Sequence, residues 1–330
     1  MRVGEGFRRR AMKNQKIFGA KMQKIKTKSF KSAKSMWFYI GFMALPMLQF
    51  IIFYIGVNFN SFLLAFRNIV FNSETKRYDY FWTFNNFTNW FKDTNEFELI
   101  CQTLKISLKT YAIMLIVGVP LGLFFAYYIF KKLPGSMFFR FMLFMPSIIA
   151  SIVLVTIFRY FTDYVVPELL KLFNVKLETT LLSSKTTRYV TVMFYNIFVS
   201  FGTSVLLYSN KMASISPEMT EAAELDGANA FQEFFHIVLP QVFSTLSVFL
   251  ITGIAALFTN EINNFSFFNY NWKPDTATLG FLMYFRTQKA KADISQYPPL
   301  AALGLMMSAI AIPLTFLVRW LLNKYGPSED

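Results

Sequence analysis

The chain has 330 residues, of which 54% are hydrophobic and only 16% are charged, and phenylalanine alone contributes 41. Soluble domains carry about 25% charged residues, so this composition argues against a soluble protein and favours a membrane protein. Cys101 is the only cysteine, which rules out an intrachain disulfide. His236 is the only histidine, and the sequence contains neither a cysteine/histidine spacing typical of a metal site nor a glycine-rich phosphate loop.

The first segment of the chain, residues 1–36, carries much of the net charge of +14. It holds twelve lysines and arginines against a single acid, Glu5. Positive charge beside an apolar run marks the cytoplasmic side of a membrane, so we predict a basic cytoplasmic N-terminal arm. A basic segment can also bind nucleic acid, but a position directly before an apolar run is typical of a topology determinant. We therefore predict no nucleic-acid partner.

Six apolar runs follow the arm, at residues 38–57, 110–130, 138–158, 189–208, 238–258 and 299–318. About 20 apolar residues are enough to cross a bilayer as a helix. We predict an all-α membrane protein whose six transmembrane helices occupy residues 37–325, with a short tail at 326–330. Both termini then lie in the cytoplasm, and the aromatic-rich segments 58–104 and 259–298 lie outside without an inserted domain.

Uncharged polar side chains in the fourth and fifth runs offer a path for a polar solute. They are Tyr195, Asn196, Ser200, Thr203, Thr252 and, just after the fifth run, Asn260. Polar groups in membrane helices also bond neighbouring helices, at about 0.6 kcal/mol each. The residues by themselves leave both interpretations open.

An acidic segment separates these two runs. Glu221, Glu224 and Asp226 lie within six residues, and each acid would cost about 2.5–3.5 kcal/mol in hydrocarbon. The segment must therefore lie in water. Ser216 suits a helix N-cap and Pro217 the first helical turn, while Gly227 can take the left-handed conformation that ends a helix. We predict one helix up to Gly227 and a second short helix at about 229–236.

This segment resembles the cytoplasmic signature of the permease subunits of binding-protein-dependent ABC importers. The signature consists of Glu-Ala-Ala, three residues, Gly, nine residues and Ile-x-Leu-Pro, and the positions that match it are Glu221, Ala222, Ala223, Gly227, Ile237, Leu239 and Pro240. Asp226, Gly227 and Ala228 resemble the carbohydrate branch of that family, in particular permeases related to the larger maltose permease subunit but without its inserted outer domain. The resemblance implies the type I ABC importer permease fold.

The resemblance also implies partners. The two helices at about 213–236 would be coupling helices that contact a cytoplasmic ABC ATPase, of which the importer would hold two copies. The contact residues implied are Glu221, Ala222, Ala223, Asp226, Gly227, Ile237, Leu239 and Pro240. A second, different permease subunit, an external solute-binding protein and a sugar substrate complete the expectation, and a homodimer also fits the sequence. The chain itself would be no enzyme and hold no cofactor or metal, because the ATPase binds ATP.

Within the resemblance, Asn196 and Asn260 correspond to sugar-contacting positions. Alternatives remain open beside a sugar permease of a bacterial cell membrane. The same fold can carry another neutral or small solute. An ion-coupled secondary transporter belongs to a different class, and it would need an acidic residue or charge relay within the membrane; none of the six runs holds an acidic residue.

Overall fold

The computed structural model describes residues 33–175 and 177–327, with side chains from Met36 onward. Most of the predicted basic arm and the end of the predicted tail lie outside the described residues. The chain divides into two compact units, residues 1–63 and 64–330, and each is described here by itself.

The described part of the first unit is a single long helix. It comprises α2 (Ala33–Gln49), the π-helical turn η1 (Phe50–Gly56) and α3 (Val57–Ala65), which runs into the second unit. Residues Met36–Ala65 form one stretch of 30 residues that is long and apolar enough to cross a membrane. The first predicted span, 38–57, is therefore helical and extends further at both ends. A lone helix cannot bury its own apolar side chains, so this one requires lipid or other helices around it.

The second unit opens with a β-hairpin that the all-α prediction did not include. Strand β1 (Arg67–Asn72) pairs antiparallel with β2 (Arg77–Trp82), with Ile69 opposite Tyr80. β-Branched and aromatic residues favour paired strands. The Asn72 side chain stabilises the turn because its oxygen accepts hydrogen bonds from the backbone N–H groups of Glu74 and Thr75, at 3.0 and 3.2 Å. Helix α4 (Asn85–Lys92) follows.

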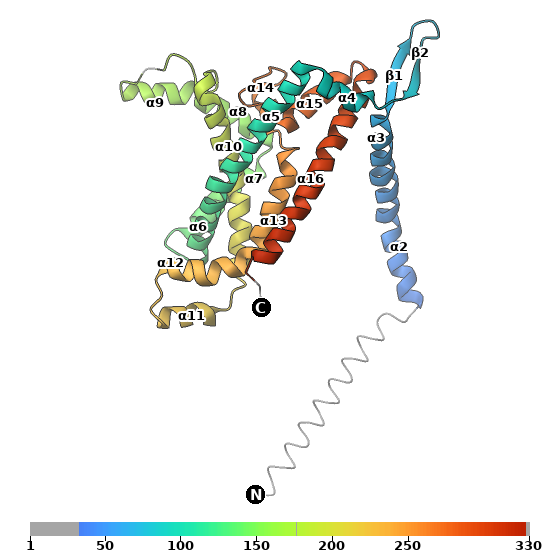
Figure 1. Ribbon diagram of the computed structural model, residues 1–330. Coiled ribbons are helices and arrows are strands. Elements are labelled where there is room, and N and C mark those ends of the chain that lie inside the picture. Colours follow the sequence, from blue (N-terminus) through green and yellow to red (C-terminus); the bar gives the residue numbers. More distant parts are fainter. Residues whose placement is uncertain (1–32, 176, 328–330) are drawn as a thin grey trace. The chain divides into compact units, whose positions relative to one another are not determined.

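Four long helices form the body of the second unit (Figure 1). The first consists of α5 (Thr94–Ile113), the π-helical turn η2 (Met114–Gly118) and α6 (Val119–Phe130), and the second is α10 (Lys185–Met212). The third ends with α13 (Leu239–Leu257), and the fourth is α16 (Tyr297–Tyr325). They contain the predicted spans 110–130, 189–208, 238–258 and 299–318, of which only Phe258 falls one residue past its helix. Figure 1 shows α14 (Asn264–Phe268) and α15 (Leu279–Ala290) at one end of this bundle, and α11 (Pro217–Leu225) and α12 (Ala230–Glu233) at the other.

The third predicted span, 138–158, is not one straight helix. It divides into α7 (Ser136–Ile148) and α8 (Ser151–Tyr160), and a bend of 107° separates them. Ile149 and Ala150 have extended backbones, with ψ of 136° and 131°. Pro146 contributes because it removes one helical N–H near this end. After α8 come a π-helical turn, η3 (Phe161–Val165), and α9 (Val166–Leu172). The described residues thus hold five helices able to span a membrane, or six if the bent pair counts as one.

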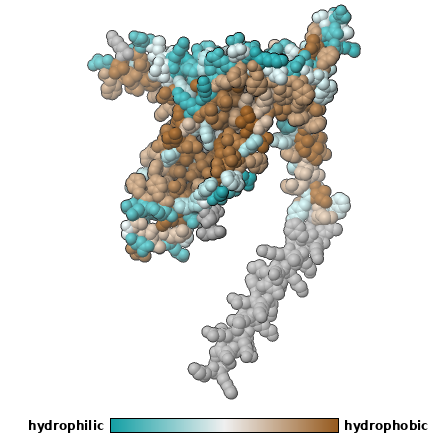
Figure 2. All heavy atoms as spheres, viewed as in Figure 1, coloured by the Kyte–Doolittle hydropathy of each residue, from teal (hydrophilic) through white to brown (hydrophobic). Residues whose placement is uncertain are grey.

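Among the apolar clusters of the described residues, two lie towards opposite ends of the bundle. Trp90, Leu279, Leu282 and Leu303 belong to the cluster near α15, and Tyr208 belongs to the cluster near α12, together with Val205, Met212, Phe234 and Val238. In Figure 2 the apolar surface of this unit forms a band between hydrophilic ends. A band of that kind matches the hydrocarbon layer that the sequence predicts around these helices.

Candidate functional site

The acidic segment folds into the first of the two predicted helices as expected. Helix α11 (Pro217–Leu225) has Ser216 at its N-cap, although the serine side chain makes no capping hydrogen bond, and it has Glu218 in the first turn. Gly227 has a φ of 77°, in the left-handed region, and its N–H donates to the carbonyl of Glu224 at 3.1 Å. Glycine takes this conformation without a steric cost, which explains why the helix ends here.

The second helix differs from the prediction of a short separate element. Asn229 caps α12 through a capping box, because its oxygen accepts from the Gln232 N–H at 2.9 Å while the Gln232 side chain accepts from the Asn229 N–H at 2.8 Å. From there the chain stays helical through the π-helical turn η4 (Phe234–Val238) into α13, a stretch of 28 residues. Pro240 has no N–H to donate and would disrupt a regular α-helix, and the wider π-helical turn lies directly before it. The helix continues past Pro240 through this turn and does not stop at His236.

The predicted contact residues fall into two groups. Glu221, Ala222, Asp226 and Gly227 are exposed, whereas Ala223 is buried and Ile237, Leu239 and Pro240 are half-buried at the base of the bundle. Four apolar side chains near them are also exposed, namely Met219, Leu225, Phe231 and Phe235. Leu225 alone is 89% exposed. Exposed apolar side chains in a water-facing segment favour a protein partner.

Lys131, between α6 and α7, ties both of these helices to the bundle, which sequence analysis did not anticipate. Its Nζ lies 2.9 Å from Glu224 Oε1 on α11 and 3.0 Å from Glu233 Oε2 on α12. The Tyr127 hydroxyl donates to the carbonyl of Ala230 at 3.3 Å. The available signal in the sequence was one acid, Glu233, in the segment predicted to lie on the same side of the membrane as Lys131.

The pKa of Lys131 reflects this environment. Burial lowers it, but the hydrogen bonds with Glu224 and Glu233 outweigh burial and raise the pKa above its ordinary value of 10.5. A raised lysine pKa contributes stability that is fully present below the unfolded value and is lost only as the pH rises through the folded value. The Lys131 contacts therefore persist throughout the neutral range.

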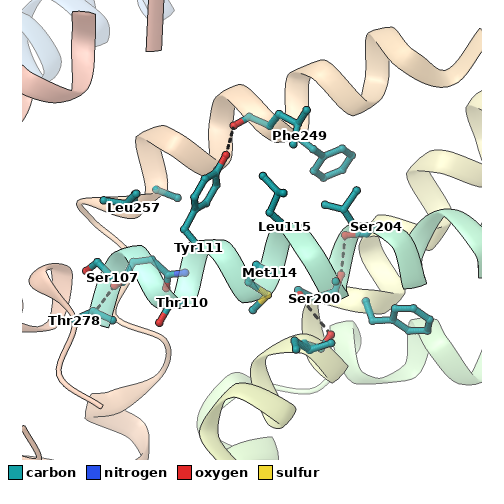
Figure 3. A pocket seen from close by; sticks show the side chains of 18 of the residues that line it. Ser107, Thr110, Tyr111, Met114, Leu115, Ser200, Ser204, Phe249, Leu257 and Thr278 are labelled. Carbon is teal, nitrogen blue, oxygen red and sulfur yellow. Dashed lines mark hydrogen bonds between the residues drawn. The ribbon is translucent and has the colours of Figure 1, made fainter. Parts of the chain in front are cut away.

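A cavity of about 170 Å³ lies between α5, α10 and α13 (Figure 3). None of the described residues that line it is charged. Its polar lining consists of Ser107, Thr110, Tyr111, Ser200, Ser204, Tyr208, Asn260 and Thr278. Apolar residues such as Met114, Leu115 and Phe249 complete the walls. A site with apolar walls and a few polar groups is typical of a binding pocket for an uncharged polar molecule.

Most hydroxyl groups in the cavity are already hydrogen-bonded within the protein. Ser107 Oγ accepts from the Leu279 N–H at 2.9 Å, and Tyr111 donates to the Leu250 carbonyl at 3.4 Å. Ser204 donates to the Ser200 carbonyl at 3.1 Å. Because a hydroxyl oxygen has two lone pairs, these groups can still accept hydrogen bonds from a solute. Spacing was the available signal for this lining, since Ser200, Ser204 and Tyr208 recur every four residues along one helix face.

Of the six predicted path residues, Ser200 and Asn260 line the cavity, while Tyr195, Asn196, Thr203 and Thr252 do not. Asn196 is buried and donates to the carbonyls of Val192 and Ile262, at 2.8 and 3.0 Å, while its oxygen accepts from Asn263 at 2.9 Å. Both of its donors are thus used inside the protein. This bonding corresponds to the alternative of helix bonding, and the sugar contact of Asn196 stays a prediction.

Tyr195, Thr203 and Thr252 lie outside this cavity for separate reasons. Tyr195 is 1% exposed, and its ring packs against those of Phe158 and Phe267, with centroids 5.1 and 5.0 Å away. Thr203 and Thr252 are exposed side chains outside the cavity, and Thr252 donates to the backbone of its own helix at 2.8 Å. A helix turns by 100° per residue, so neighbouring polar residues need not share a face.

Comparison with known proteins agrees with this architecture. The model of the family described as "Binding-protein-dependent transport system inner membrane component" matches residues 118–326. The multiple sugar-binding transport system permease protein MsmF of Streptococcus mutans is 26% identical over 245 residues, which cover 74% of this chain and 82% of that protein. The maltose/maltodextrin permease protein MalF of Klebsiella aerogenes is 26% identical over 186 residues, 54% of this chain and 35% of MalF.

A solved structure shares the fold. The crystal structure of a bacterial ABC transporter involved in the import of the acidic polysaccharide alginate matches with a TM-score of 0.72 at 16% identity, covering 90% of this chain and 99% of that one. The family match spans more than half of the described protein and includes α10, α11, α12 and the cavity-lining part of α13. The chain therefore belongs to the family of inner membrane components of binding-protein-dependent transport systems.

Proposed function

We propose that the chain is the permease subunit of an ATP-driven importer that passes a sugar, delivered by an external binding protein, into the cytoplasm. The uncharged cavity lined by hydroxyl and amide groups carries this proposal, because a neutral sugar binds through hydrogen bonds to polar groups between apolar walls. The names of MsmF and MalF as sugar permeases support the substrate class.

The volume of the cavity supports a second permease subunit. Pockets for drug-sized ligands measure about 300–1,000 Å³, and this cavity measures about 170 Å³. An oligosaccharide therefore needs further space, which a second permease facing the cavity supplies. We propose a heterodimer, with two copies of a cytoplasmic ATPase docked on the exposed coupling helices. Glu221, which is exposed and pairs with none of the described residues, would then face a basic residue of the ATPase.

The alternatives predict different energy sources and solutes. A secondary transporter would need an acidic residue or a charge relay at its binding site, and none of the described residues that line the cavity is an aspartate, glutamate, histidine, lysine or arginine. To test the proposal, the permease pair and ATPase are reconstituted in proteoliposomes with binding protein, and uptake of labelled mono- and oligosaccharides is measured. We expect sugar uptake that requires ATP and survives collapse of ion gradients. Uptake driven by an ion gradient without the ATPase would refute the importer proposal, and uptake of other solutes alone would refute the sugar proposal.

The proposed orientation yields a topology prediction. The segment 212–235 and both termini lie in the cytoplasm, whereas Lys76 and Lys289 lie outside, because the basic arm is retained inside. In a background with Cys101 replaced by serine, single cysteines at Thr75 and Thr220 are treated with a membrane-impermeant thiol reagent on intact cells. We expect labelling at position 75 and none at position 220 until the cells are opened. The reverse pattern would invert the proposed orientation.

Asn260 and Asn196 are expected to respond differently to substitution. Asn260 lines the cavity and accepts one bond from the Ile262 N–H at 2.9 Å, while its side-chain NH₂ donates to none of the described residues. We therefore expect Asn260→Ala to leave a sugar hydroxyl unpaired. That loss costs about 1–3 kcal/mol, or about 5- to 150-fold in apparent affinity. Asn196→Ala instead releases Ile262 and Asn263, so we expect a lower thermal midpoint with a smaller change in affinity.

Uptake at limiting sugar and thermal unfolding of the solubilised complex measure the two effects. Asn89→Ala is the matched control, because Asn89 is exposed on α4, away from the cavity. If both variants lost affinity equally and Asn196→Ala were not destabilised, Asn196 would be a sugar-contacting residue.

A further inference from the structure

The coupling helices are connected to two walls of the cavity by different means. Helix α12 continues into α13, which carries Phe249, Gly253 and Leu257 on one wall. The opposite wall belongs to the helix Thr94–Phe130, which carries Ser107, Thr110 and Tyr111. That helix ends at Phe130, next to Lys131. Unlike α13, it is not continuous with either coupling helix, so only side-chain contacts connect it directly to α11 and α12.

Lys131 bridges this gap. Its Nζ contacts Glu224 on α11 and Glu233 on α12, at 2.9 and 3.0 Å, at the end of α6. Its backbone is fixed as well, because its N–H donates to the Tyr127 carbonyl at 3.0 Å. Tyr127, one turn earlier, donates through its hydroxyl to Ala230. Two side chains of one helix end thus hold both coupling helices.

The burial of Glu233 makes the ion pair between Lys131 and Glu233 hard to break. Glu233 is 3% exposed, and Lys131 supplies its ion pair among the described residues. A buried carboxylate without a partner is strongly unfavourable, so the pair resists separation more than a surface ion pair does. Glu224 is 60% exposed at its side chain and contributes less.

We propose that Lys131 is a positioning residue that makes the α5–α6 wall of the cavity move with the coupling helices. Movement of α11 and α12 by an ATPase then shifts both walls together, one through the continuous helix α12–α13 and the other through Lys131. Without Lys131 the α5–α6 wall keeps the Tyr127 contacts with Ala230 and Phe234 but loses its ion pairs with both coupling helices. It then follows the coupling helices less closely, and ATP hydrolysis opens and closes the cavity less efficiently. This inference rests on the proposed importer function.

The experiment compares ATP hydrolysis and solute uptake in the same proteoliposomes. Lys131→Met removes the bridge and keeps the length of the side chain. We expect the ATPase to remain bound and stimulated by loaded binding protein, while solute transported per ATP falls by about tenfold, within the usual range of coupling between sites. Lys132→Met is the matched control, since Lys132 is the exposed neighbour and forms no ion pair with the described residues; it should retain the wild-type ratio.

A double variant separates coupling from stability. Lys131→Met with Glu233→Gln removes the bridge without leaving a buried charge unpaired, so it should fold as the wild type does and still transport about tenfold less per ATP. Wild-type transport per ATP in the double variant would overturn the inference and leave Lys131 with a purely structural role. An unmodified importer that moves no sugar would refute the proposed function instead, so the two failures are distinguishable.

Discussion

Gly227→Pro is expected to abolish solute uptake while the protein still inserts into the membrane. Gly227 has a φ of 77° at the end of α11, whereas proline is held near −65° and has no N–H to donate to Glu224. The native turn would be disfavoured by about 3 kcal/mol or more, which lowers its population at least about a hundredfold. Helix α11 would then be misplaced relative to the proposed ATPase partner, and uptake in whole cells measures the loss.

Gly227→Asn is the control for this prediction. A Cβ at position 227 would meet no atom within 4 Å, and asparagine tolerates the left-handed region better than other residues with a side chain. We expect Gly227→Asn to keep most of the uptake. Equal loss in the two variants would show that the conformation of this turn is not what matters, and full uptake by Gly227→Pro would contradict the role of α11.

Gly202→Ala is expected to destabilise the bundle. Gly202 lies where α10 crosses α7, and a Cβ there would overlap the backbone carbonyl of Leu143. Backbone cannot rotate away as a side chain can, so the two helices must separate, at a cost of about 1–3 kcal/mol. The measurement is the thermal midpoint of the solubilised protein, followed by loss of the monodisperse peak in size-exclusion chromatography.

Gly304→Ala is the matched substitution for Gly202→Ala. It also adds a methyl group within a long membrane helix, but its nearest neighbour would be the flexible end of Met283 at 3.6 Å. Ordinary contact and the better helix propensity of alanine should leave stability unchanged or slightly higher. A midpoint of Gly202→Ala as high as that of Gly304→Ala would mean that α7 and α10 do not approach closely at this point.

The positions of the long helices could be predicted from the sequence because hydrophobicity and length are local properties. Runs of about 20 apolar residues predict membrane spans wherever they lie in the chain. Four of the six predicted runs lie within long helices of the second unit. The ends of α11 were equally local, since Pro217 and Gly227 act through their own backbone conformations. The family resemblance of the acidic segment rests on residues close together in the chain.

The third span and the hairpin show where local patterns are insufficient. The run 138–158 is uniformly apolar, yet the chain bends between α7 and α8. Ser151 donates to Asn263 at 2.9 Å, which anchors the start of α8 to a loop 112 residues away. Hydropathy contains no information about such an anchor. The hairpin 67–82 likewise depends on hydrogen bonding between two short strands. The aromatic-rich composition of this segment does not predict that pairing.

The sequence by itself indicated a helical membrane protein with an acidic segment between two of its spans, because apolar length, helix caps and acidic residues act locally. The likeness to importer permeases rests on the residues of that acidic segment. Tertiary structure decided what individual polar residues do. Asn196 bonds Asn263, 67 residues away, instead of facing the cavity, and Lys131 bonds Glu233 across 102 residues. Which side chains meet across such separations depends on how the helices rotate and pack against each other, and no local pattern specifies that rotation.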